Sequence, residues 1–189
     1  VYCNPQNQMI REKIVILGAG ESGTGTAKLA KKQGFQVFVS DRGIIPQSTK
    51  NIFDNLGVDW EEETHTLAKM EDAQYIMKSP GIPDNTPIVQ SLKAHEIPVI
   101  SEIEFASKYT KATLIGITGS NGKTTTAMMT FKILDDAGYN VALAGNIGNS
   151  FAKEVAENDY QFYVLEISSF QLDDILNFVP HIGIITNIT

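Results

Sequence analysis

The sequence of 189 residues has little of several features that would place it in a specialised class of protein. Its single cysteine, Cys3, excludes an internal disulfide and favours a reducing compartment. No apolar run approaches the ~18–20 residues that span a bilayer, and the opening VYCNPQNQMI lacks the charged and then apolar pattern of a signal peptide. We therefore expect a cytoplasmic protein without a membrane partner.

Positive charge is also scarce, since 15 Lys and Arg face 22 Asp and Glu and leave a formal charge of −7. A nucleic-acid partner is not expected, because such proteins need a basic face to displace counterions. The three histidines have no metal-ligand spacing with Cys3, which argues against a zinc site. With 42% apolar and 20% charged residues, the composition is that of a globular protein of one large or two small domains.

Short β-rich segments alternate with helical segments along the first half of the chain. Strands are predicted at 13–17, 36–40, near Val58, 74–78 and 98–100, and helices at 22–33, 49–56 and 87–95. Such alternation predicts a parallel sheet covered by helices. We therefore expect an α/β protein whose N-terminal domain, residues 1–107, is Rossmann-like.

A second cycle follows the polar and partly helical stretch Ser101–Lys111, which we interpret as the domain boundary. Strands are predicted at 113–118, 140–144, 161–166 and 181–185, and a helix at 123–137. No linker separates the halves, so we expect them to pack directly. Residues 108–189 are interpreted as a P-loop-type α/β ATPase domain that is truncated, because the chain stops after an apolar strand.

The first glycine-rich loop has the pattern G-x-G-x-x-G, from Gly18 to Gly23. Between a strand and a helix, this pattern allows a tight turn and presents helix N–H groups to a diphosphate. Asp41 lies 18 residues beyond Gly23, where an acidic side chain can hold ribose hydroxyls. A dinucleotide and a nucleotide sugar offer the same groups, and the glycines could also serve the turn alone.

The second loop, T-G-S-N-G-K-T-T over residues 118–125, also joins a strand to a helix. Its backbone N–H groups would form a nest for phosphates, with Lys123 reaching the β and γ oxygens and Thr124 ligating Mg²⁺. Ile117 stands where the general pattern has its first glycine. The alternative is an accidental turn rich in glycine and lysine.

Polar residues elsewhere could complete a site at the same sheet edge. Glu166 ends a predicted strand, and the carboxyl ends of parallel strands share one edge, so its carboxylate could join an Mg²⁺ shell beside Lys123. The alternative is a solvated surface carboxylate. Asn146 could face a substrate there, and the Ser79-Pro80-Gly81 turn could contact a ligand. His65 and His95 are expected to be solvated at the surface.

The combination of G-A-G-E-S-G, S-P-G, T-G-S-N-G-K-T-T, G-N-I-G and L-E-I-S-S-F-Q-L across residues 13–189 resembles the N-terminal domain and part of the central domain of a Mur ligase. The resemblance implies a ligase of peptidoglycan synthesis and cell wall biogenesis. It also implies that the first domain binds the UDP of a nucleotide sugar and that the central domain binds ATP with Mg²⁺. UDP-N-acetylmuramoyl-L-alanine and D-glutamate are the implied substrates, joined through an acyl phosphate by an enzyme expected to be monomeric.

The resemblance also implies roles for individual residues. The catalytic residues would be Lys123, Glu166 and Asn146, with Thr124 and Glu166 as metal ligands. ATP would contact Gly119, Ser120, Asn121, Gly122, Lys123, Thr124 and Thr125. The substrate would contact Gly20, Ser22 and Gly23 at its diphosphate, Asp41 and Arg42 at uridine, Ser79 and Gly81 at the nucleotide sugar, and Asn146, Ser168 and Gln171 at its reacting end.

Two other functions stay open at this point. An NAD-dependent oxidoreductase would use the first domain but leaves the Lys123 loop without a role, and a UDP-sugar-binding module would bind without catalysis. The family continues with an acidic and histidine-containing segment, a modified lysine and a C-terminal domain. Because these are absent from the 189 residues, we expect a fragment that is inactive alone.

Overall fold

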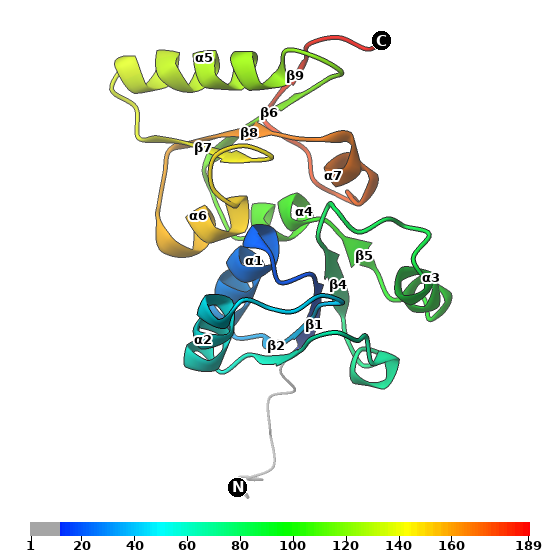
Figure 1. Cartoon of the computed structure of the whole chain (residues 1–189). Coiled ribbons are helices and arrows are strands. Elements are labelled where there is room, and N and C mark those ends of the chain that lie inside the picture. The colour runs from blue at the N-terminus through cyan, green and yellow to red at the C-terminus, as the bar shows by residue number, and fades with distance from the viewer. Residues whose placement is uncertain (1–11) are drawn as a thin grey trace, which may run out of the picture.

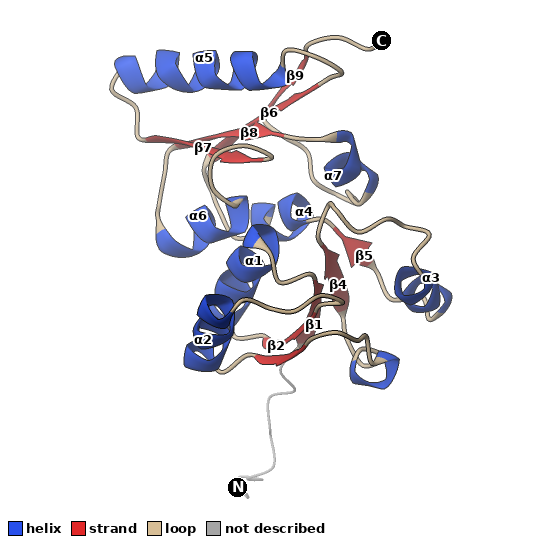
Figure 2. Cartoon of the chain, viewed as in Figure 1, coloured by secondary structure: helices blue, strands red, loops and turns tan. Residues whose placement is uncertain are grey.

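Two parallel β-sheets, one from each half of the sequence, form the framework of the chain, and helices lie between and around them (Figure 1). The computed structural model describes residues 12–189, so Cys3 lies outside the described residues. Figure 2 shows the alternation of strand and helix that the sequence predicts. The expected α/β fold with a parallel-sheet N-terminal half is confirmed.

The first sheet contains five strands in the order β3-β2-β1-β4-β5, and every neighbouring pair is parallel. The strands are β1 (Lys13–Leu17), β2 (Gln36–Ser40), β3 (Asp59–Glu61), β4 (Tyr75–Lys78) and β5 (Val99–Ile100). The helices are α1 (Glu21–Lys32), α2 (Gln47–Leu56), the 3₁₀ helix η1 (Leu67–Lys69) and α3 (Pro87–Ala94). The order reverses between β1 and β4, and ligands of such sheets bind where the loops diverge at that point.

Alternate residues of β1 serve two separate apolar layers. Ile14 and Ile16 face the layer that contains α1, whereas Val15 and Leu17 face the layer that contains α3. All four side chains are fully buried. This explains the continuous apolar run of the strand, because a parallel sheet is covered on both faces.

The second sheet has the order β7-β8-β6-β9, again with parallel pairs. Its strands are β6 (Thr113–Thr118), β7 (Val141–Gly145), β8 (Phe162–Glu166) and β9 (Ile182–Ile185). Helix α5 (Lys123–Asp136) covers one face, while α6 (Phe151–Glu157) and α7 (Ser169–Asp173) lie on the side of the first sheet (Figure 1). The short helices α6, α7 and η1 were not predicted, because five to seven residues or fewer show little helical periodicity.

The two halves pack directly, as the absence of a linker predicts. One apolar cluster contains residues of both sheets and of the helices between them, with α1 against α6 and both against α4 (Glu102–Ser107). Helix α4 ends at Ser107, and the domain boundary after residue 107 stays a prediction.

Helix α4, within the partly helical stretch 101–111, is buried between the two halves. Glu102 and Glu104 are 1% and 0% exposed, since backbone and hydroxyl donors of the second half surround their carboxylates. Glu102 Oε1 accepts from the Ser150 hydroxyl and the Ala152 N–H at 2.6 and 2.8 Å. The polar sequence therefore forms the joint between the halves. Within residues 12–189, no helix is long and apolar enough to cross a membrane.

Candidate functional site

The glycine-rich loop after β1 closes tightly on the start of α1. Gly18 has a φ of +96°, and a Cβ on Gly23 would lie 1.9 Å from the Gly18 carbonyl oxygen. Only glycine at position 23 allows this approach. Asp41 at the end of β2 accepts from the Ala19 N–H at 2.6 Å and from the Gly43 N–H at 2.7 Å. The Asp41 carboxylate thus connects the loop after β1 with the loop after β2, at the carboxyl edge of the sheet where it was predicted to lie.

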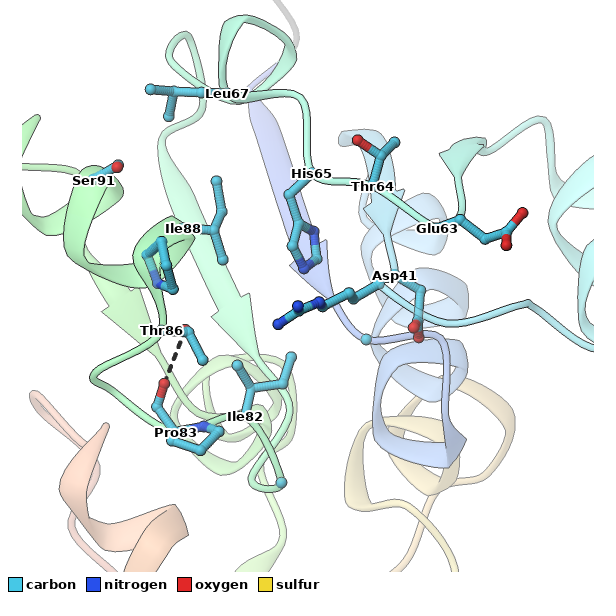
Figure 3. Close-up of a pocket in the computed structure, with 14 residues that line it drawn as sticks. Asp41, Glu63, Thr64, His65, Leu67, Ile82, Pro83, Thr86, Ile88 and Ser91 are labelled. Atoms are coloured by element: carbon cyan, nitrogen blue, oxygen red, sulfur yellow. Dashed lines mark hydrogen bonds between the residues drawn. The ribbon is translucent and has the colours of Figure 1, made fainter.

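A cavity of about 640 Å³ opens at the carboxyl ends of β1, β2 and β4 (Figure 3). Of the predicted substrate residues, Asp41, Arg42 and Gly81 line it, together with Gly18 of the loop. Sequence reasoning missed the rest of its wall, which comes from the segment between β3 and η1 and from the segment that runs from the turn after β4 into α3. These residues are Glu63, Thr64, His65, Leu67, Ile82, Pro83, Thr86, Pro87, Ile88 and Ser91.

His65 is the clearest correction among the candidate residues. It was expected to be solvated, but it is half-buried and its ring projects into the cavity (Figure 3). Burial lowers the pKa of His65, opposed by the charges of Glu61 and Asp41 and aided by Arg42. No local pattern in the sequence distinguishes it from exposed His95.

The other predicted residues of the first half lie near this cavity without lining it. Gly20 lines a neighbouring hollow of about 480 Å³ that shares Asp41 with the cavity and also has Lys28 and Lys153 in its wall. Ser22 is half-buried in the first turn of α1. The Ser79 hydroxyl is buried beneath Gly18 and has no hydrogen-bond partner within the described residues.

The second glycine-rich loop leads from β6 into α5, as predicted. Gly119 and Gly122 have φ values of +135° and +81°, and Gly122 is the N-terminal cap of the helix. The Lys123 ammonium donates to the Gly119 carbonyl at 2.7 Å and to the Ser120 carbonyl at 3.2 Å. The loop therefore carries a cation at the start of a 14-residue helix, an arrangement suited to anionic phosphate oxygens.

Three of the predicted catalytic and metal-binding residues meet beside this loop. The Thr124 hydroxyl donates to Glu166 Oε2 at 2.8 Å, and Asn146 Nδ2 donates to Glu166 Oε1 at 2.7 Å. Glu166 is 2% exposed and ends β8, next to β6 in the sheet. The alternative of a solvated surface carboxylate is excluded.

The chemistry of this group fits Mg²⁺. A hydroxyl and a carboxylate are oxygen ligands, and Mg²⁺ characteristically takes one or two protein oxygens together with phosphates and water. Among residues 12–189, no group of three or more His, Cys, Asp and Glu side chains forms a metal site. The pair Thr124 and Glu166 is thus a partial shell that suits a metal shared with a phosphorylated ligand.

Asn187 is a residue of this loop that sequence reasoning missed. Its side-chain carbonyl accepts from the Asn121 N–H at 2.9 Å, and its backbone carbonyl accepts from the Ser120 N–H at 3.0 Å. Asn187 follows β9, which pairs with β6, so the sheet order alone brings it here. Its position could be inferred only from knowing that order.

Ser168 and Gln171, predicted to face the substrate, bind each other in the structure. They form a capping box at the start of α7, in which the Ser168 N–H donates to Gln171 Oε1 at 3.0 Å. Gln171 is buried. Their contact with a substrate stays a prediction, while their structural role is to fix the start of the helix.

A buried ion pair connects the Ser79-Pro80-Gly81 turn to α7. Lys78 at the end of β4 lies 2.9 Å from Asp174, the C-terminal cap of α7, and 2.9 Å from Asp84. It also donates to the Ile82 carbonyl at 2.9 Å. Burial opposes the charge of Lys78, but hydrogen bonds to Asp174 and Asp84 raise its pKa. The turn that lines the cavity is therefore held by a residue of the second half.

Comparison with known proteins relates this geometry to a family. Residues 12–101 match a family model described as Mur ligase MurD-like, N-terminal domain, and residues 117–189 match the Mur ligase middle domain. A UDP-N-acetylmuramoylalanine–D-glutamate ligase of Christiangramia forsetii is 54% identical over 178 residues, which are 94% of this chain and 40% of the relative. The enzyme of the same name from Bacteroides fragilis is 51% identical over the same shares.

A solved structure supports the fold. The UDP-N-acetylmuramate:L-alanyl-gamma-D-glutamyl-meso-diaminopimelate ligase from Neisseria meningitides superposes with a TM-score of 0.59 at 22% identity, covering 95% of this chain and 61% of that one. The chain spans about 40% of the length of the curated relatives that it matches.

Proposed function

The chain belongs to the Mur ligase family, and we propose that it carries the nucleotide-sugar site and the phosphate loop of a UDP-N-acetylmuramoylalanine–D-glutamate ligase. This ligase uses ATP to drive formation of an amide bond during the synthesis of peptidoglycan precursors. The relatives at 54% and 51% identity support the choice of substrates, UDP-N-acetylmuramoyl-L-alanine and D-glutamate. Because the chain spans 40% of those relatives, the complete reaction is proposed for the longer protein.

The observation that carries the proposal is the convergence of Thr124, Glu166 and Asn146 beside the Lys123 loop. Lys123 would neutralise charge on the transferring phosphoryl group, where preorganised charges lower the barrier most. Thr124 and Glu166 would hold Mg²⁺, which when bound would supply positive charge that offsets the negative charge of the phosphates. Asn146 would orient the Glu166 carboxylate and contact the substrate.

Bond making and bond breaking follow from the substrates. A carboxylate oxygen of UDP-N-acetylmuramoyl-L-alanine attacks the γ-phosphorus of ATP, ADP leaves, and an acyl phosphate results. The amine of D-glutamate then attacks the acyl carbon, phosphate leaves, and the nitrogen loses a proton. The cavity at Asp41, Arg42 and Gly81 would hold the nucleotide end, leaving the substrate carboxylate to reach the second half.

Calorimetric titration of the 189-residue chain tests the two sites separately. In Lys123→Ala, the affinity for ATP with Mg²⁺ should fall about 10–100-fold, the range expected for a lost charged hydrogen bond, while UDP affinity stays unchanged. Lys132→Ala is the matched control, because Lys132 is an exposed lysine of the same helix. An equal loss of UDP affinity in Lys123→Ala would contradict two separate sites.

Glu166→Gln tests the metal site. The variant keeps the shape and the contact with Asn146 but removes the negative charge, so ATP binding should need a higher Mg²⁺ concentration. An unchanged Mg²⁺ requirement would contradict the assignment of Glu166 as a metal ligand. Titration with NADH provides a third comparison, since binding of NADH without binding of UDP would instead favour an oxidoreductase domain.

A further inference from the structure

The ring of His65 is held in one orientation by buried groups behind it. Its Nδ1 lies 2.7 Å from the hydroxyl oxygen of Ser40, the last residue of β2. Ser40 is fully buried, and its hydroxyl is 2.8 Å from Glu61 Oε1 and 3.2 Å from the Thr64 carbonyl. Glu61 is itself buried at the end of β3.

This arrangement determines which nitrogen of His65 carries a hydrogen. A carboxylate and a carbonyl can only accept, so the single hydroxyl hydrogen of Ser40 is directed to one of them. The Thr66 N–H, Lys69 and Ser40 hold the pKa of Glu61 below its usual range although burial opposes this, so its carboxylate is ionised. Ser40 must therefore accept from the Nδ1–H of His65. In the neutral ring, Nε2 is left with a lone pair.

Nε2 is the atom that is available to a ligand. It has no hydrogen-bond partner among residues 12–189, and Figure 3 shows the ring reaching into the cavity. Burial and the charge of Arg42 both lower the pKa of His65, while Glu61 and Asp41 oppose them and the ring stays neutral at pH 7. Arg42 lines the same cavity and offers only donors.

We propose that His65 selects the nucleobase, with its Nε2 lone pair accepting the N3–H of uracil while Arg42 donates to a neighbouring ring carbonyl. The proposal rests on the proposed function, which places a UDP compound in this cavity. An acceptor beside a donor complements the imide edge of uracil, which presents N–H between two carbonyls. Cytosine has a lone pair at N3, so the contact with Nε2 would become repulsive. It also has an amino group in place of the C4 carbonyl, so Arg42 would lose its acceptor if it donates to that position.

Ser40 and Glu61 act as positioning residues in this scheme. They touch the back of the imidazole and fix its hydrogen on Nδ1, so the identity of the acceptor atom is set before a ligand arrives. A buried, unmatched polar contact lowers affinity by about 10–100-fold, which is the discrimination between UDP and CDP expected from this one contact.

The 189-residue chain can be titrated with UDP, CDP and N3-methyl-UDP. Wild type should bind UDP about 10–100-fold more tightly than either of the others. His65→Phe keeps a ring but has no acceptor, so its affinities for UDP and CDP should become similar. His65→Gln offers a carbonyl acceptor and should recover part of the preference. His95→Phe, at a half-exposed histidine that does not line the cavity, should keep all of it.

Nitrogen-15 NMR of the histidine rings provides a readout that does not depend on a ligand. Wild type should show His65 protonated at Nδ1 and not at Nε2, and Ser40→Ala should lose this fixed tautomer. The opposite tautomer in wild type, or equal affinities of wild type for UDP and CDP, would overturn the role of His65 and leave the UDP site standing. Absence of UDP binding to wild type would overturn the proposed function and this assignment with it.

Discussion

The two glycine-rich loops have the same backbone design and opposite charges. Each follows a buried parallel strand, contains a glycine with positive φ and leads into a helix. In the first loop, the Asp41 carboxylate binds the Ala19 N–H. In the second, the Lys123 ammonium binds the carbonyls of Gly119 and Ser120.

We infer from this difference that the charged side chain at each loop, more than the glycine pattern, selects the ligand. A carboxylate beside the first loop suits the ribose hydroxyls of a nucleotide. A lysine in the second suits the several charges of a polyphosphate. This is why the fingerprint G-x-G-x-x-G alone leaves NAD and a nucleotide sugar as alternatives.

The two halves also differ in how much apolar surface they cover. In the first sheet, β1 is buried on both faces, whereas β9 in the second has Ile182 and Ile185 at 49% and 63% exposed. On α5, Met128, Met129 and Ile133 are also more than half exposed. We expect the first half to be the more stable of the two, since burial of apolar area is the main stabilising contribution.

The largest effect on stability should come from the ion pair that joins the halves. Lys78→Met leaves Asp174 buried without its cation, which should lower the free energy of unfolding by about 3–5 kcal/mol. Chemical denaturation measures this. Adding Asp174→Asn should restore much of the loss, because no unpaired charge is then buried. Lys93→Met breaks only the exposed pair with Asp84 and should cost under about 1 kcal/mol.

A glycine substitution tests the first loop without touching the second. Gly23→Ala places a Cβ 1.9 Å from the Gly18 carbonyl oxygen, so the loop and α1 must separate. We expect a loss of about 2–3 kcal/mol in the free energy of unfolding and weaker UDP binding, with ATP binding unchanged. Gly20→Ala is the control, because nothing lies within 4 Å of its Cβ. Equal stability of the two variants would refute the close packing.

Glu104 offers a smaller test of the joint between the halves. Its Oε2 accepts from the N–H groups of Leu176, Asn177 and Phe178 at 3.2, 2.9 and 2.7 Å. Glu104→Gln removes the charge from these hydrogen bonds and should lower the free energy of unfolding by about 2 kcal/mol. Glu71→Gln, at an exposed glutamate, is the matched control.

The pH dependence of this variant has a definite sign. Burial alone would raise the pKa of Glu104, but the three N–H groups and Lys108 hold it below the usual 4.5. Its stabilisation is therefore complete above pH 4.5 and is lost as the pH falls through the lower, folded-state pKa. Glu104→Gln should lack this part of the decrease in the free energy of unfolding that wild type shows at acid pH. Parallel acid profiles would contradict the role of the carboxylate.

Contacts that follow from strand order within one half could be predicted from the sequence. Thr124 and Glu166 meet because the carboxyl ends of parallel strands lie at the same edge of the sheet. The two glycine-rich loops mark in the sequence where the preceding strands end. The buried contacts of Glu104 were not predicted, because its backbone donors lie more than 70 residues away. His65 looked solvated, because its contact with Ser40 depends on how β3 pairs with β2. Both residues have tertiary partners that no local sequence pattern contains.

The smallest predicted effect is a pH dependence of stability that arises from His65 in the first half. Burial holds the folded-state pKa of His65 below the usual 6.5, so below that pH the unfolded chain binds a proton that the folded chain does not. The free energy of unfolding should therefore fall as the pH drops through and below 6.5, before the carboxylates titrate. His65→Gln should flatten this part of the curve, measured by denaturation between about pH 5 and pH 7. His95→Gln, at a half-exposed imidazole, controls for the loss of one histidine. A His65→Gln curve parallel to that of wild type would contradict the lowered pKa of His65. With saturating UDP, the wild-type slope should become steeper, because a ligand that contacts the Nε2 lone pair binds only the neutral ring.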